Sequence, residues 1–334
     1  MPWEEKLKKY VAEIEAGLQG FIGSLDFGDS AGLRTMLRYH MGWEDNLGGG
    51  KRLRPVITLL CAGACGGSTA AAMPAALGIE FLHNFTLIHD DIEDRSLTRH
   101  GRPTLWTRWG LAQAVNAGDA LFSIAQLAFL GLAETRGEVV ALRATREMNR
   151  VCLNLTRGQY LDIAFETEDD VDLDAYLGMI GGKTAALIGF CTAVGGMIAG
   201  ADDAVVEDLG DFGRSLGMAF QIQDDYLGIW GDQAVTGKSA ASDLLARKKT
   251  LPVLYGLRES ADFRSLWQIE NPSMEQVESM AHLLEACGAD GYVEELAGKF
   301  IDQAKAALNK LFPEPNDDAR VLIALTEMLL HRKM

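Results

Sequence analysis

The sequence predicts an all-α protein, and three observations support this prediction. Apolar residues recur three and four positions apart through most of the 334 residues, which is the period of a helix that buries one side. No run of alternating apolar and polar residues has the length of a strand. Hydrophobic residues make up 48% of the chain, enough for a large core. We therefore expect a single helical domain over residues 1–334, or a helical domain with a small C-terminal helical extension.

Apolar periodicity places most of the helices directly. It begins at Trp3 and again at Leu33, on either side of a break rich in Gly and Asp. Gly48 to Pro55 then forms a loop with three cations, and Pro55 suits the first turn of the next helix. Another apolar helix begins at Leu251. The other expected helices cover residues 55–66, 70–94, 110–132, 138–165, 174–200, 203–229, 260–268, 274–287, 290–311 and 317–331.

Two segments interrupt this helical period and are rich in cations. They are Arg95 to Thr104 and Gly231 to Lys249. The second contains Gly237-Lys238, but five residues separate its two glycines where a P-loop has four, and no strand precedes it. We expect a segment that faces a phosphate group without being a nucleotide loop.

The bulk composition excludes several partners. A net charge of -16 and a pI near 4.8 argue against nucleic acid and anionic membranes, which both need basic surfaces. Five cysteines without C-x-x-C spacing indicate free thiols in a reducing compartment, not a zinc or disulfide framework. The first residues lack the pattern of a signal peptide, so a cytoplasmic location is expected.

One apolar segment resembles a membrane span in length. Thr184 to Ala201 carries no charge over a stretch close to the lower limit for a transmembrane helix. It is rich in Gly, Ala and Thr, and the mean hydropathy of the chain is only +0.02. A buried central helix explains it better, so no transmembrane segment is expected.

Acidic residues close two apolar helices far apart in the chain. Asp90 and Asp94 are one helical turn apart and share a face, and Asp224-Asp225 ends a second apolar run. Carboxylates at this spacing are suitable ligands for a hard cation such as Mg²⁺. The alternative is a helix that ends in a solvated acidic turn. If the two helix ends face each other across a cavity, they form one metal site.

Cations occur near these acids and suggest the substrate. They lie near Lys51 and Arg54, at Arg99, at Lys183 and at Lys238, on a scaffold with a deep apolar interior. A basic loop alone is usually just solvated. Metal-binding carboxylates, cations that grip oxygens and an apolar cavity together suit a molecule with a diphosphate at one end and a hydrocarbon at the other. Isoprenoid diphosphates have this structure.

At these residues the chain resembles the trans-prenyltransferases, or isoprenyl diphosphate synthases, over nearly its whole length. The matching elements, in order, are Gly50-Lys51-Arg52-Leu53-Arg54-Pro55, His83, Asp90 to Asp94 followed by Arg99, Lys183-Thr184, Phe220-Gln221-x-x-Asp224-Asp225, Gly237-Lys238, and Asp243 with Lys248-Lys249-Thr250-Leu251-Pro252. The resemblance implies an all-α isoprenoid-synthase fold with helices around a central active-site cavity, and a homodimer.

The resemblance also implies a role for each motif. Three Mg²⁺ ions would be held by the metal ligands Asp90, Asp91, Asp94, Asp224 and Asp225. Asp90, Asp94, Lys183 and Asp224 would be catalytic, and backbone carbonyls near Lys183-Thr184 would offset the charge of an allylic cation. Isopentenyl diphosphate would be held by Lys51, Arg54 and His83, and its partner, an allylic diphosphate, by Arg99, Lys183, Gln221 and Lys238. His100, Thr184 and Lys248 complete the expected substrate-binding residues.

The chain departs from the family pattern at two positions. Gly228 stands where the second acidic motif usually has a further Asp, and His100 stands where a second Arg is common. We expect activity to be retained, because Asp224 is present and Arg102 lies close to His100 in the sequence.

Residues that precede Asp90 on the same helix are expected to set the product length. Phe85 lies five residues earlier, roughly 7.5 Å along a helix, Thr86 beside it is small, and Phe81 and Leu82 lie about one turn deeper. In the resembling family this arrangement is similar to that of geranylgeranyl diphosphate (C20) synthases, with farnesyl diphosphate (C15) as the alternative. Ordinary core packing is the other explanation for Phe85. Two other functions are possible on this fold. A class I terpene cyclase would have no use for Lys51, Arg54 and His83. A non-catalytic partner subunit would be expected to lack the acids.

Overall fold

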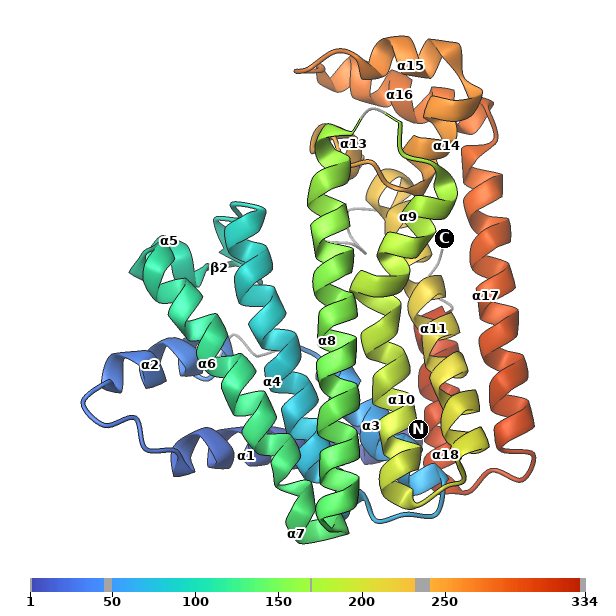
Figure 1. Ribbon diagram of the computed structural model, residues 1–334. Coiled ribbons are helices and arrows are strands. Elements are labelled where there is room, and N and C mark those ends of the chain that lie inside the picture. The colour runs from blue at the N-terminus through green and yellow to red at the C-terminus, as the bar shows by residue number, and fades with distance from the viewer. Residues whose placement is uncertain (1, 45–49, 169, 232–240, 331–334) are drawn as a thin grey trace. The chain divides into compact units, whose positions relative to one another are not determined.

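The structure is a computed structural model that describes residues 2–44, 50–168, 170–231 and 241–330. Most of these residues are helical and only four lie in strands, so the prediction of an all-α fold is confirmed (Figure 1). The helices are α1 (Pro2–Ser24), α2 (Ala31–His40), α3 (Leu53–Ala64), α4 (Thr69–Glu93), α5 (Leu105–Trp109), α6 (Leu111–Leu130), α7 (Leu132–Arg136), α8 (Glu138–Thr167), α9 (Leu173–Ile180), the π-helical turn η1 (Gly181–Ala185), α10 (Ala186–Ala199), α11 (Asp203–Trp230), α13 (Ser242–Leu245), α14 (Leu251–Glu259), α15 (Ala261–Trp267), α16 (Met274–Ala286), α17 (Ala289–Leu311) and α18 (Asp317–Leu330). Two strands of two residues each, β1 (Thr98–Arg99) and β2 (Arg102–Pro103), form an antiparallel hairpin.

The helices expected from apolar periodicity are present, with ends that differ by only a few residues. Five features were not predicted. Helices α5, α7 and α13 and the β1–β2 hairpin are too short to show a period, and the segment expected as one helix over 174–200 contains the π-helical turn η1. The hairpin contains Arg99 and η1 contains Lys183 and Thr184, which we had expected to bind substrate.

The chain divides into two compact units. Unit 1 comprises Met1–Glu147, Cys191–Val206 and Glu314–Leu322, and unit 2 comprises Met148–Phe190, Glu207–Pro313 and Ile323–Met334. The single domain over residues 1–334 stays a prediction.

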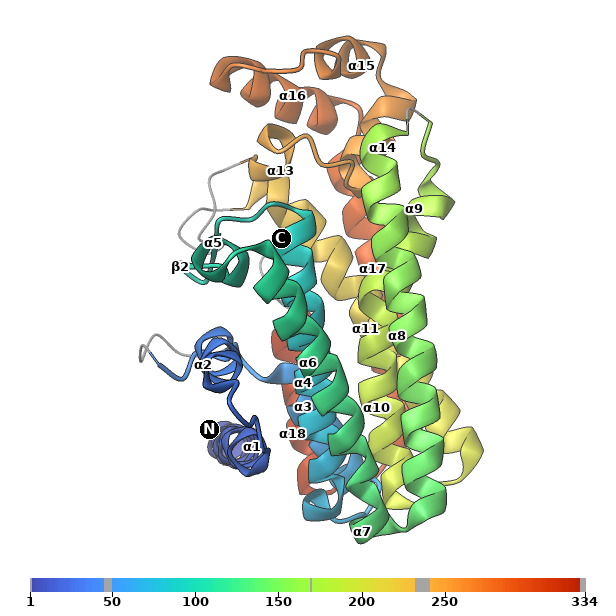
Figure 2. The same cartoon turned by 60° about the vertical axis from the view of Figure 1, so that its left-hand side comes forward.

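Helix α4 is the centre of unit 1. It packs against α3 and α6, and both views show α6 running alongside it (Figures 1 and 2). The contact is close because small side chains on both helices are buried, among them Ala75 and Ala76 of α4 and Ala114, Ala117 and Ala125 of α6. Helix α4 thus has fixed neighbours on two sides up to its acidic end.

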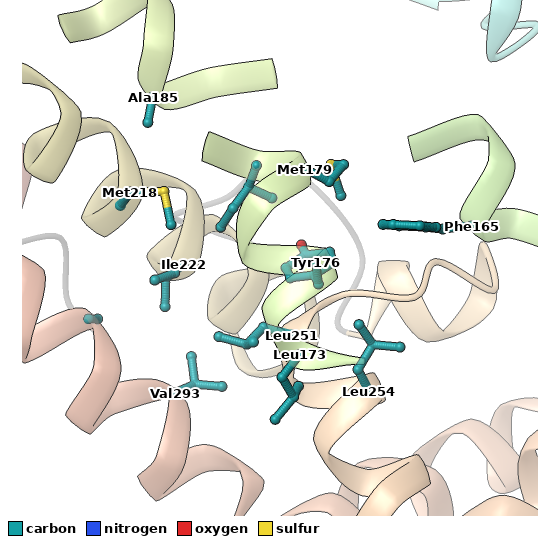
Figure 3. Packing of buried hydrophobic residues seen from close by; sticks show 12 residues of the cluster. Phe165, Leu173, Tyr176, Met179, Ala185, Met218, Ile222, Leu251, Leu254 and Val293 are labelled. Carbon is teal, nitrogen blue, oxygen red and sulfur yellow. The ribbon is translucent and has the colours of Figure 1, made fainter. Parts of the chain in front are cut away.

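A cluster of apolar side chains forms the core of one part of unit 2 (Figure 3). It joins the end of α8 to α9, η1, α11, α14 and α17. Ile222 of α11, Val293 of α17 and Leu251 of α14 meet in it and are almost fully buried. This core holds the helices that carry the second acidic motif.

Within the part of the chain that the structure describes, three helical stretches are long and apolar enough to cross a membrane, judged by length and composition alone. They are Thr69–Glu93, Leu111–Arg136 and Leu173–Ala199. The expectation that the chain has no transmembrane segment stays a prediction.

Asn316 links two helices of unit 1. Its amide nitrogen donates to the carbonyl oxygens of Gly63 (3.0 Å) and Ala64 (3.1 Å) at the end of α3. Its side-chain oxygen accepts from the backbone N–H of Ala319 (2.9 Å) in the first turn of α18. One side chain therefore satisfies groups at a helix C-terminus and at a helix N-terminus.

We expect Asn316→Ala to lower the free energy of unfolding by about 2 kcal/mol, because a helix cap and the hydrogen bonds to α3 are lost together. Urea unfolding measures this change. Asn116→Ala, at an exposed position of α6, is the matched control and should change stability by about 0.5 kcal/mol or less. Equal effects of the two substitutions would show that Asn316 does not link α3 to α18.

Candidate active site

The first acidic motif forms the C-terminal cap of α4. Asp94 is the capping residue, and its N–H bonds to the carbonyl of Asp90 (2.8 Å). The N–H of Ser96 bonds to the carbonyl of Asp91 (2.9 Å) and that of Arg95 to Ile92 (3.2 Å), which together make a Schellman motif. Arg95 takes the left-handed conformation (φ 51°) that this motif requires, although it is not glycine. The cap fixes the chain direction immediately after the acids.

The three aspartates of this motif differ in their surroundings. Asp91 is buried, and the guanidinium of Arg99 donates to both of its oxygens at 2.9 and 3.0 Å. Burial raises the pKa of Asp91, while the bond to Arg99 opposes that shift. Asp90 is half-buried and Asp94 is exposed. The Asp91 carboxylate therefore anchors Arg99, and Asp90 and Asp94 provide oxygens one helical turn apart.

The loop that carries Arg99 is a tight hairpin. His100 and Gly101 both have positive φ (51° and 74°), as in the type I′ turns that join two-residue hairpins. The turn places His100 at the surface. Burial and the nearby Arg99 lower the pKa of His100.

Arg102, which lies close to His100 in the sequence, holds α2. Its guanidinium is buried and donates to the carbonyls of Tyr39 (2.7 Å) and His40 (3.4 Å) at the end of α2. That activity is retained with His100 in place of a second Arg stays a prediction.

Two of the residues expected to bind isopentenyl diphosphate are in contact. Arg54 Nη1 lies 3.1 Å from His83 Nε2. Burial and the neighbouring Arg54 lower the pKa of His83 well below its usual value, so its imidazole is neutral. A guanidinium can only donate, so Nε2 of His83 accepts and its proton is on Nδ1. Lys51 is exposed at the start of the same segment.

The residues expected to set product length follow α4 toward its acidic end. Phe81, Leu82 and Thr86 are buried, whereas Phe85 is only half-buried. The Phe85 ring contacts the rings of His89 (centroids 4.8 Å apart) and Phe122 of α6 (5.2 Å). Phe85 is thus held in place by aromatic contacts next to the acidic end of α4.

In unit 2, the expected residues Lys183 and Thr184 lie in the π-helical turn η1. Single π-helical turns inside α-helices are rare and often occur at functional sites. Gly158 of α8 permits this turn, because a Cβ at that position would lie 2.3 Å from the backbone nitrogen of Lys183. The Lys183 ammonium donates to Asp162 of α8 (2.5 Å). Asp162 was not among the expected site residues, because nothing in the sequence indicates that it pairs with a lysine 21 positions away.

The second acidic motif has one aspartate bonded inside the protein. Asp225 accepts from the hydroxyl of Tyr176 (2.6 Å), from Gln221 (3.2 Å) and from the backbone N–H of Leu251 (3.3 Å). Burial raises the pKa of Asp225 to about 7, although these hydrogen bonds oppose the shift. Figure 3 shows Tyr176 within the apolar cluster of unit 2. Asp224, on the next position of α11, is half-buried.

A hydrogen bond joins this motif to the π-helical turn. The Thr184 hydroxyl donates to Gln221 (2.9 Å), which in turn donates to Asp225. Thr184, Gln221 and Asp225 therefore form one connected network on η1 and α11. Asp224 and Lys183 each adjoin a member of this network in the sequence.

Asp243 fills the space beside Gly228, the position that lacks the usual acid. A Cβ on Gly228 would lie 1.9 Å from the Asp243 carboxylate. Asp243 is in the first turn of α13, which ends in a second Schellman motif: the N–H of Lys248 bonds to the Asp243 carbonyl (2.9 Å), and Arg247 is left-handed (φ 57°). The structure therefore places a carboxylate where the sequence alone indicates a loss.

The two lysines after this motif have different surroundings. Lys248 is exposed. The ammonium of Lys249 donates to the carbonyls of Phe165 (2.9 Å), Glu166 and Glu168 at the end of α8. Lys249 thus caps α8, as cations near a helix C-terminus do, and Lys248 is the lysine exposed to solvent.

These contacts divide the expected site residues into two sets. Unit 1 brings together Arg54 with His83, Asp91 with Arg99, and the face of α4 that ends in Asp90 and Asp94; unit 2 joins Thr184, Gln221 and Asp225. Lys238 and Gly237 lie outside the described residues. Asp224 and Asp225 lie inside α11, which continues to Trp230, so the second acidic motif does not end its helix as expected. That the two acidic motifs face each other stays a prediction.

The donor set fits Mg²⁺ that is shared with a substrate. Among the described residues, no group of three or more His, Cys, Asp or Glu side chains gathers closely enough to hold a metal ion. Mg²⁺ is usually bound by one or two carboxylates together with substrate phosphates and water, and seldom by a cage of protein ligands. Asp90 and Asp94 provide such a pair of hard oxygen ligands.

Comparison with known proteins identifies the relatives of this chain. Residues 38–287 match the polyprenyl synthetase family. A geranylgeranyl diphosphate synthase of Mycobacterium tuberculosis is 40% identical over 90% of this chain and 87% of its own length. A (2E,6E)-farnesyl diphosphate synthase of Mycobacterium bovis is also 40% identical, over 81% of this chain and 78% of its own. The crystal structure of a geranylgeranyl pyrophosphate synthetase from Pyrococcus horikoshii superposes with a TM-score of 0.88 at 30% identity and covers 100% of both chains.

We expect Gly228→Asp to destabilise the protein by about 3 kcal/mol, because overpacking is added to the repulsion between two carboxylates. Combining it with Asp243→Gly should restore most of the loss, since the new carboxylate then occupies the emptied place. Thermal unfolding of the two single variants and of the double variant measures this coupling. Gly178→Asp, at an exposed glycine of α9 with open space around it, is the control. Simple addition of the two single effects would show that Gly228 and Asp243 do not share this space.

Proposed function

Because this chain belongs to the polyprenyl synthetase family, we propose that it condenses isopentenyl diphosphate head to tail with an allylic diphosphate and releases geranylgeranyl diphosphate. The observation that supports elongation is the contact between Arg54 and His83 in the unit that carries Asp90 and Asp94. A cyclase, which ionises one diphosphate, has no use for a second anion site. Farnesyl diphosphate is the alternative product.

Asp90, Asp94 and Asp224 would hold the Mg²⁺ ions, three in each active site. When bound, Mg²⁺ supplies positive charge to the oxygens of the departing diphosphate. We assign Asp91 and Asp225 to a different role, because the first is bonded to Arg99 and the second to Tyr176, Gln221 and Leu251. These two aspartates orient their neighbours and the groups that grip the substrate.

Cations of the chain hold the allylic diphosphate. Arg99 is oriented by Asp91, and Lys183 is oriented by Asp162. Lys238 and Lys248 complete these cations, the neutral amide of Gln221 would bind beside them, and His100 would lie at the edge of the set. Cations held in place before the reaction stabilise the charge that develops on the leaving oxygen without reorganisation.

The π-helical turn would offset the charge of the allylic cation. Its hydrogen bonds run from i to i+5, so the carbonyls of Lys183 and Thr184 depart from the α-helical pattern. A carbonyl oxygen directed at the cation would lower its energy, and apolar walls would exclude the water that would quench it. The Thr184 hydroxyl bond to Gln221 holds this turn in place.

Lys51 and Arg54 would bind the diphosphate of isopentenyl diphosphate, with His83 beside them. His83 carries its proton on Nδ1 and accepts from Arg54 at Nε2, so it orients the guanidinium without adding charge. The double bond of isopentenyl diphosphate attacks the allylic carbon. The intermediate then loses a proton to the released diphosphate, so no nucleophilic side chain is needed.

We propose that the enzyme is a homodimer. Exposed apolar side chains follow one side of α8, among them Val139, Leu142, Leu153 and Tyr160, and Leu127 and Leu130 are exposed on α6. Val139 has 82% of its surface exposed, which is unfavourable for a large apolar side chain in water. A second copy of the chain that presents the same surface would cover these apolar side chains of α8 and α6.

We place the enzyme in the cytoplasm. All five cysteines are free, as expected in a reducing compartment.

Incubation with isopentenyl diphosphate, each allylic diphosphate and Mg²⁺, followed by identification of the product, tests the proposed function. We expect a C20 diphosphate, and no turnover after chelation of Mg²⁺, because the leaving diphosphate is then not neutralised. Asp90→Asn should lower kcat by about 10²-fold or more.

A cyclic hydrocarbon would establish a terpene cyclase, and no product would indicate a partner subunit. Turnover that persists without divalent metal would contradict the metal-dependent mechanism.

Phe85→Ala should lengthen the product beyond C20, because the half-buried ring next to the acidic end of α4 would no longer close the cavity. Product chain length on chromatography measures this. Phe212→Ala is the matched control: Phe212 is fully buried on α11 and is not among the residues expected to set product length, so its loss should leave the length unchanged. An unchanged product with Phe85→Ala would show that Phe85 is only a packing residue.

A further inference from the structure

A buried arginine lies between the two cations that we assign to isopentenyl diphosphate. Arg52 follows Lys51 directly and precedes Arg54 by two positions. Its side chain is only 1% exposed, while Lys51 is exposed and Arg54 is half-buried. The three cations of this segment therefore do not form one solvated patch.

The Arg52 side chain contacts three other elements of unit 1. Nε donates to Glu15 of α1 (2.7 Å), Nη1 to Glu80 of α4 (2.7 Å), and Nη2 to the carbonyl of Met41 at the end of α2 (2.9 Å). The two carboxylates raise the pKa of Arg52 and outweigh the effect of its burial. The start of α3 is therefore tied to α1, α2 and α4 through one side chain.

Two further hydrogen bonds orient the carboxylates of this network. The indole N–H of Trp43 donates to the second oxygen of Glu15 (2.9 Å). The side-chain amide of Asn84 donates to the oxygen of Glu80 that also accepts from Arg52 (2.9 Å). Neither carboxylate can turn without breaking a second bond.

The backbone at Arg52 and the position of Glu80 on α4 also relate this network to the Arg54–His83 contact. Arg52 has a left-handed conformation (φ 51°, ψ 33°), which is unfavourable for a residue with a Cβ. Glu80 lies one helical turn before His83, the residue that contacts Arg54. The bond from Arg52 to Glu80 thus fixes the start of α3 against α4 at the level at which Arg54 meets His83.

We propose that Arg52 is a positioning residue for the isopentenyl diphosphate site, and that Glu15 and Trp43 act on this site through it. The inference rests on the proposed function, because it takes Lys51, Arg54 and His83 as the site. Stability alone does not account for the network, since well-packed apolar side chains are often as stable as a buried ion pair. A rigid fork that reaches three helices sets the separation of Lys51 and Arg54 from His83.

Steady-state kinetics with each substrate varied separately test this role. Arg52→Lys keeps the charge but loses the fork, so it should raise the KM for isopentenyl diphosphate by about tenfold or more, as small misplacements of binding groups do. Glu15→Gln and Trp43→Phe leave the Arg52–Glu80 bond in place and should raise this KM by about threefold. The KM for the allylic diphosphate should stay within about twofold, because Arg52 does not hold that site.

Two controls separate positioning from stability and from the site assignment. Tyr10→Phe removes the hydrogen bond from α1 to Asp318 (2.6 Å), so it should lower the thermal midpoint and leave both KM values unchanged. Lys51→Ala tests the site itself and should raise the KM for isopentenyl diphosphate. If Lys51→Ala has this effect while the Arg52, Glu15 and Trp43 variants lower only the midpoint, the positioning role is overturned and the proposed function stands. If Lys51→Ala has no effect, the assigned site is wrong and this inference fails with it.

Discussion

A charged group buried on an apolar helical scaffold must have a polar partner, and this constraint organises both acidic motifs. Asp91 is paired with Arg99, Asp225 with Tyr176, and Glu80 with Arg52. Asp91 in one motif and Asp225 in the other are buried and bonded inside the protein. Their neighbours, Asp90 and Asp94 in one motif and Asp224 in the other, lie on helices that these internal bonds fix. The same paired acids that stabilise the fold thus orient the carboxylates that we assign to metal.

Local geometry is least regular where substrate groups are expected. Two Schellman motifs have an arginine in the left-handed conformation, at Arg95 after the first acidic motif and at Arg247 before Lys248. Between α9 and α10, the π-helical turn η1 presents Lys183 and Thr184 and requires a glycine on α8. Such departures from ideal geometry are unfavourable by themselves and persist when packing around them determines the conformation. Their concentration beside the expected binding residues supports the assignment of these places to substrate.

The sequence predicted the long helices and both acidic motifs because these are local patterns of spacing. It did not distinguish Arg52 from Lys51 and Arg54, since adjacent cations look alike until burial separates them. It also indicated a lost carboxylate at Gly228, whereas Asp243, 15 positions later, lies against that glycine. Nor did the sequence indicate that Arg102 holds α2, because its bonds to Tyr39 and His40 cross more than sixty residues of sequence. Contacts at such separations depend on the fold and leave no periodic signal.

We propose that Asp90 and Asp94 of α4 and Asp224 of α11 bind metal ions that share one diphosphate. Crystals grown with Mn²⁺ and inorganic diphosphate test this proposal, because anomalous scattering locates each ion. We expect Mn²⁺ beside both motifs, with oxygens of a single diphosphate as common ligands. Ions found at one motif only, or too far apart for one diphosphate to reach them, would show that the two motifs do not share a substrate.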